Sequence, residues 1–162
     1  MTNIPAYIEL YTWGQFAPVF ALVGIAILIL MADTFLPRLP KCLYPIVGGI
    51  SAAVTACFMY GESGGPGFSF IICIATALSL FLAYDYHKVM CDSVAGGDNA
   101  EGTGEFNALC LIACAGACGL VQAHDLVVLF VCLETLTLSS YALAGYFRRN
   151  QGSIEAGVKY LV

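Results

Sequence analysis

The chain has 162 residues, of which 60% are hydrophobic and only 10% are charged. A soluble domain carries about 25% charged residues, because much of its surface still faces water. The composition therefore excludes a soluble globular protein and predicts an all-α integral membrane protein in a lipid bilayer. The net charge of −5 and an acidic connection before the fourth apolar run argue against binding to nucleic acid.

Four charge-free runs, and a fifth run with a single charged residue, match the ~20 residues that a helix needs to cross the hydrocarbon layer. In chain order they are Leu10–Ala32, Cys42–Gly61, Ser63–Tyr84, Phe106–Ala123 and Leu126–Phe147. A sixth run starts near Ile154 and reaches Val162. The predicted fold is therefore five transmembrane helices plus the start of a sixth. No Lys or Arg precedes the long first run, so we expect a retained helix and not a cleaved signal peptide.

Gly and Pro predict where these helices end. The first helix is expected to begin near Phe16–Pro18, because Pro is tolerated in a first turn, and to end at Ala32–Asp33. The Gly- and Pro-rich segment 62–67 predicts a loop. Residues 85–105 predict a longer, flexible connection.

The basic residues of the connections predict the orientation of the chain. They follow the first, third and fifth runs and are Arg38, Lys41, Lys88, Arg148 and Arg149. The N-terminal segment and the other connections contain no Lys or Arg. Because cytoplasmic loops are enriched in these residues, we expect the N-terminus outside, and in a bacterium we expect the inner membrane.

Glu134 is the one charged residue in the run Leu126–Phe147. It lies ~12 Å from the Leu126 end of that run. A charge at such a depth costs at least ~2.5–3.5 kcal/mol and is by default functional. Burial raises the pKa of a carboxyl, and a nearby cation lowers it again. A carboxyl that lies between these two influences can take up and release protons. The alternative is a structural carboxyl that Thr137 and Tyr141, on the same helix face, hydrogen-bond.

Lys159 is the second candidate for proton transfer. Ser153 is well placed as an N-cap, with Glu155 in the first turn, so Lys159 falls more than one turn into the sixth helix. The pKa of a lysine can shift strongly when the side chain is buried, which suits a proton relay. The alternative is a lysine that extends along the helix to the nearby cytoplasmic interface.

Cys110, Cys114 and Cys118 recur at every fourth position and share one helix face. Soft thiolates could bind zinc, copper or an iron–sulfur cluster. The alternative is a stripe of small residues that allows close helix packing. No His or carboxylate stands at ligand spacing, so we favour packing and expect no metal.

The segment from Gly104 to Val162 carries more specific motifs. These are Gly104-Glu105-Phe106, Asp125-Leu126, Leu133-Glu134, Tyr141-x-Leu143-Ala144-Gly145-Tyr146 and Glu155-Ala156-Gly157-x-Lys159-Tyr160. The segment resembles helices four to six of the antiporter-like N subunit of respiratory complex I, which is called subunit 2 in mitochondria and has a counterpart in the plastid enzyme. Residues 1–103 resemble the same subunit in helix count, in orientation and in the turn Ala32–Pro37.

The resemblance implies the N-terminal portion of an antiporter-like inverted-repeat helical bundle. Residues 1–103 would form three N-terminal transmembrane helices and a flexible cytoplasmic loop. Residues 104–162 would begin the proton-translocating module. The implied function is that of a membrane-arm subunit of proton-pumping NADH–quinone oxidoreductase, a translocase of the respiratory electron transport chain. Glu134 and Lys159 would then carry the proton-translocation roles.

The same resemblance implies partners and cofactors. Other membrane-arm subunits would surround this chain, and NADH and quinone would be used by the complex while this chain binds no cofactor. In the family, the glutamate that matches Glu134 modulates a lysine on a later helix, so this chain alone is not expected to be catalytic. Two alternatives remain open. One is a related cation/proton antiporter or membrane-bound hydrogenase subunit, and the other is a truncated membrane protein that only packs against partners.

Overall fold

In the computed structural model, the structure describes residues 13–35, 43–63, 67–95, 103–146 and 151–161. These residues form helices and short connections, and no strand occurs among them. The helices are α2 (Trp13–Phe35), α3 (Leu43–Ser63), α4 (Phe68–Ala95), α5 (Thr103–Gln122), α6 (Leu126–Ala144) and α7 (Gln151–Leu161). The prediction of an all-helical chain is confirmed for this part of it.

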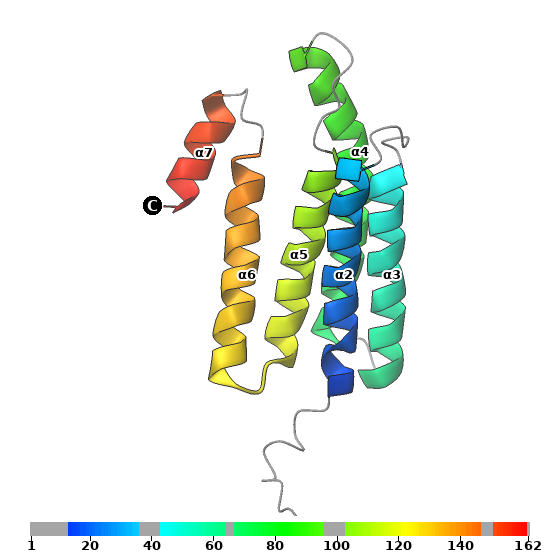
Figure 1. The fold of residues 1–162 in the computed structure, drawn as a ribbon. Coiled ribbons are helices and arrows are strands. Elements are labelled where there is room, and N and C mark those ends of the chain that lie inside the picture. The colour runs from blue at the N-terminus through cyan, green and yellow to red at the C-terminus, as the bar shows by residue number, and fades with distance from the viewer. Residues whose placement is uncertain (1–12, 36–42, 64–66, 96–102, 147–150, 162) are drawn as a thin grey trace, which may run out of the picture.

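Successive helices run in opposite directions, so the C-terminal ends of α2, α4 and α6 lie at one end of the molecule (Figure 1). α5 is the central element, because it contacts α2, α3, α4 and α6. α6 lies on the outside of α5, and α7 folds back along the C-terminal half of α6 (Figure 1). The up-and-down course agrees with the alternation that the apolar runs predict.

The core lies between α2, α3, α4 and α5 and consists mainly of small and branched apolar residues. Its fully covered members are Leu22, Ala26, Ala52, Cys73, Leu80, Ala108, Leu111 and Cys118. Small residues let helix backbones approach closely, which is how helices associate where lipid supplies no hydrophobic driving force. By contrast, of the described side chains of α6 only Ser139 is buried.

Three helices are long and apolar enough to cross a membrane, namely Phe16–Phe35, Thr103–Gln122 and Leu126–Ala144. Two further apolar helical stretches, Leu43–Phe58 and Phe68–Ala83, are shorter. The chain is an integral membrane protein on these grounds. Three of the five predicted spans are supported by length and composition, and the count of five stays a prediction.

Some predicted helix ends are wrong. The first helix begins at Trp13 and ends at Phe35, so Pro18 lies inside it. Pro18 is the sixth residue of this helix, so its missing N–H removes one backbone hydrogen bond, to the carbonyl of Gly14. α4 continues to Ala95, so residues 85–95 are helical and not part of a flexible loop. That segment contains neither Gly nor Pro to end the helix.

Other predictions fall on parts of the chain without a described placement. α3 extends to Ser63, which shortens the predicted loop 62–67, and residues 64–66 lie outside the described part. The Gly-rich residues 96–102 lie outside it as well. Lys88 belongs to α4, whereas the other basic residues that predict the orientation, Arg38, Lys41, Arg148 and Arg149, are outside the described residues. The outside location of the N-terminus therefore stays a prediction.

Candidate functional site

Glu134 lies near the middle of α6. It lies eight positions after Leu126 and ten before Ala144, which places it ~12 Å and ~15 Å from the two ends. Its side chain is half-buried among the described residues. The predicted position in the middle of the helix is therefore confirmed, and the depth of Glu134 in a bilayer stays a prediction.

The contact between α5 and α6 determines which way Glu134 points. A Cβ atom on Gly116 would lie 2.9 Å from the backbone nitrogen of Leu136 and 3.1 Å from the carbonyl oxygen of Cys132. Cys132 and Leu136 thus face α5. Glu134 is about 200° of helical rotation from each of them. Its side chain therefore projects from the opposite side of α6, away from the four-helix core.

The face that carries Glu134 is the face that α7 covers. Tyr141, two helical turns from Glu134 on the same side, makes an edge-to-face contact with Tyr160 of α7, with ring centroids 5.3 Å apart. Next to this pair, a Cβ atom on Gly157 would lie 3.0 Å from the Cα atom of Gly145. These contacts are antiparallel and lie along the C-terminal half of α6 (Figure 1).

Lys159 does not reach Glu134. In the register set by Tyr141–Tyr160 and Gly145–Gly157, Lys159 is level with the end of α6 and lies about 13 Å along the helix axis from Glu134. Its Nζ atom is instead 2.6 Å from Oε1 of Glu155, with both side chains largely exposed. An acidic residue four positions before a lysine is the favourable order on a helix.

One expectation near these residues is wrong, and the alternative interpretation of Glu134 as a carboxyl held by Thr137 and Tyr141 is not supported by the contacts. α7 begins at Gln151 and not at Ser153, because nothing between them interrupts the helical backbone; Ser153 is therefore not an N-cap. The hydroxyl of Thr137 donates to the backbone carbonyl of Glu134 at 3.1 Å and not to its carboxylate, and the Tyr141 ring faces Tyr160. Within the described part of the chain, the Glu134 carboxylate has no hydrogen-bond or ion-pair partner.

A second polar group, which the sequence did not predict, joins the ends of α2, α3 and α5. A Cβ atom on Gly104 would lie 2.7 Å from Oδ2 of Asp33, so the Asp33 side chain occupies the space that a larger residue would need. The buried Tyr44 hydrogen-bonds Asp33. Asp33 thus sits against the N-terminal turn of α5, where the helix dipole favours a carboxylate. In the sequence, the one feature that could have indicated this contact is the glycine of the motif Gly104-Glu105-Phe106.

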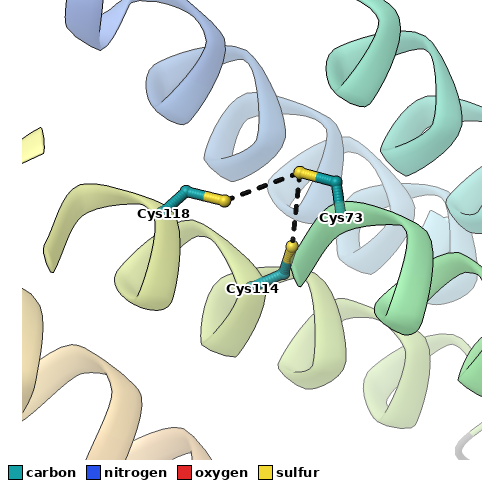
Figure 2. Close-up of side chains that lie close together, drawn as sticks. All are labelled: Cys73, Cys114 and Cys118. Atoms are coloured by element: carbon teal, nitrogen blue, oxygen red, sulfur yellow. Dashed lines mark hydrogen bonds between the residues drawn. The ribbon is translucent and has the colours of Figure 1, made fainter. Parts of the chain in front are cut away.

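Of the three cysteines on one face of α5, two belong to a group of thiols and one does not. Cys114 and Cys118 point toward Cys73 of α4, and Cys110 does not belong to this group (Figure 2). The three sulfur atoms lie within 4.8 Å of one another and all three residues are buried. Sequence spacing could not include Cys73, because its position depends on how α4 packs against α5.

The fold and the site together define a helical integral membrane protein with a carboxylate in the middle of a span. Residues 123–162 match the family described as "NADH:quinone oxidoreductase/Mrp antiporter, TM". This matched segment contains both Glu134 and Lys159.

Relatives extend the similarity over most of the chain. NADH-quinone oxidoreductase subunit N of Geobacillus sp. (strain WCH70) is 29% identical over 94% of this chain and 33% of the relative. The subunit N of Bacillus anthracis is 31% identical over 93% of this chain and 31% of the relative. NAD(P)H-quinone oxidoreductase subunit 2 of Prochlorococcus marinus (strain NATL2A) is 39% identical over 57% of this chain and 16% of the relative.

The chain is thus similar to N subunits of NADH-quinone oxidoreductases, and its C-terminal part matches a family that includes antiporters, in line with the resemblance that the motifs after Gly104 indicate. It spans about a third of the length of the two relatives that it matches almost throughout. No solved structure matches the chain.

Proposed function

We propose that the chain belongs to a membrane-arm subunit of a proton-pumping NADH–quinone oxidoreductase and contributes Glu134 to a proton path. The observation that supports the proposal is the position of Glu134 in the middle of α6. It lies on the same face as the contact with α7, beyond the part of that face that α7 covers. The relatives' names supply the reaction, and the half-buried carboxylate supplies the chemistry.

The proposal explains why Glu134 lies on the outer face of α6. A carboxylate that faced lipid at this depth would be costly, so other protein must cover it in the working assembly. α7 covers only the C-terminal half of α6, and Lys159 is about 13 Å short of Glu134 along the axis. We infer that another helix of the assembled enzyme brings a cation level with Glu134 and that the pair exchanges protons.

Lys159 has a separate role in this proposal. Together with Glu155 it forms an ion pair on the exposed surface of the second half of α7, level with the C-terminal end of α6. We propose that this pair passes protons between that surface and the path. In the assembled enzyme, other subunits would surround these helices, and NADH and quinone would react elsewhere in the complex.

Substitution of Glu134 by Gln in the assembled enzyme tests the proposal. Gln keeps the size and hydrogen-bonding capacity of the side chain but cannot release a proton, so we expect proton pumping to fall at least tenfold while the complex still assembles. The matched control is Glu105→Gln, an exposed carboxylate in the first turn of α5. Unchanged proton pumping in a normally assembled Glu134→Gln enzyme would contradict the assigned role.

A second candidate function is favoured by the family description, which also names Mrp antiporters. In that case the same carboxylate would exchange protons for another cation, without an NADH-oxidising partner. Purification of the tagged chain from its native membrane separates the two functions. Co-purification with NADH-oxidising subunits supports the first, and co-purification with membrane subunits alone supports the second.

A further inference from the structure

Three thiols converge in the core between α4 and α5, remote from the face of Glu134. Sγ of Cys73 is 3.5 Å from Sγ of Cys118 and 4.0 Å from Sγ of Cys114. The exposed fractions of Cys73, Cys114 and Cys118 are 0%, 3% and 0%. The proton path proposed above does not use them.

The separations of these sulfur atoms suit three ligands of one ion. A thiolate sulfur lies ~2.3 Å from a bound d10 metal ion, and three sulfurs spaced evenly in a plane around it are then about 4.0 Å apart. The Cys73–Cys114 separation of 4.0 Å equals that value, the Cys73–Cys118 separation of 3.5 Å is shorter, and the third pair of sulfur atoms is within 4.8 Å. The three side chains point toward one another from two helices (Figure 2).

The donor set selects the kind of ion. Thiolates favour soft ions such as Cu(I) and zinc and do not favour Mg²⁺ or Ca²⁺, which take oxygen ligands. Zinc is almost always four-coordinate, and among the described residues this group contains no His or carboxylate as a fourth ligand. Cu(I) can be three-coordinate, with three sulfur ligands.

We propose that Cys73, Cys114 and Cys118 form a three-coordinate Cu(I) site that joins α4 to α5. Binding involves no change of oxidation state when copper is supplied as Cu(I). Each thiol that becomes a thiolate ligand releases one proton to the solvent, so the affinity falls as the pH is lowered. The bound ion would fix α4 against α5 at the centre of the bundle.

The test uses the full chain in detergent, kept reduced and loaded with Cu(I) against a competing Cu(I) chelator. We expect one copper per chain after removal of excess metal. X-ray absorption of this loaded chain should show three sulfur neighbours at ~2.3 Å. No retained copper, or nitrogen and oxygen neighbours in place of sulfur, would overturn the proposal.

Variants locate the site among the eight cysteines. A chain in which the other cysteines are replaced by Ser should still retain one copper; these are Cys42, Cys57, Cys91, Cys110 and Cys132. Adding Cys73→Ser, or Cys118→Ser if the first does not fold, should lower the affinity for Cu(I) at least a hundredfold. Equal affinity with and without Cys73 and Cys118 would contradict the site. Tighter binding of zinc than of Cu(I) by the unaltered chain would also refute the assignment.

Discussion

Replacement of Gly116 by Ala tests the helix contact that turns Glu134 away from the core. A Cβ atom at this position would lie 2.9 Å from the backbone nitrogen of Leu136, and a backbone atom cannot move unless α6 moves with it. Overpacking of this kind costs about 1–3 kcal/mol. Ala also favours a helix over Gly by about 1 kcal/mol, so the net destabilisation should be about 0–2 kcal/mol.

Gly24→Ala in α2 is the matched control. No atom lies within 4 Å of the position that its Cβ would take, so only the helix propensity applies and the chain should become about 1 kcal/mol more stable. The two variants should therefore differ by about 1–3 kcal/mol in the free energy of unfolding. At about 2–4 °C per kcal/mol for a chain of this size, thermal unfolding in detergent resolves the difference. Equal unfolding temperatures would refute the close approach of α5 and α6.

Two further predictions concern the other polar groups. Gly104→Ala should be about 1–3 kcal/mol less stable than the Gly24→Ala control, because its Cβ would meet the Asp33 side chain, with Cγ only 2.6 Å away; equal unfolding temperatures of these two variants would contradict that contact. Lys159→Gln should change the stability by less than ~0.5 kcal/mol, because its ion pair with Glu155 is exposed, yet it should slow proton pumping in the assembled enzyme. Normal pumping by the Lys159→Gln enzyme would rule out the proposed role of Lys159.

The apolar runs predict the helices well and their ends less well. A run of apolar residues identifies the part of a helix that can lie in lipid, but the backbone can remain helical in polar sequence. α4 shows this most clearly, since it continues beyond the apolar stretch Phe68–Ala83 to Ala95. α6 begins at Leu126, the start of the predicted run, and ends at Ala144, where Gly145 takes the C-cap position.

The sequence predicts the position of Glu134 along its helix, but not the side of the helix on which it faces. One charge in an apolar run places Glu134 in the middle of a span without any tertiary information. The side of α6 on which it faces depends on Gly116, which brings Leu136 against α5. Likewise, the spacing of Cys114 and Cys118 places them on one face, but only the packing of α4 against α5 brings Cys73 to them.

The central claim is that Glu134 acts by releasing and taking up a proton. The most direct test compares Glu134→Asp with Glu134→Gln in the same assembled enzyme, by measuring the protons translocated for each NADH oxidised. Asp keeps a titratable carboxyl on a shorter side chain, so Glu134→Asp should retain a substantial part of the ratio while Glu134→Gln loses most of it. Equal ratios in the two variants would contradict a proton-carrying role for Glu134.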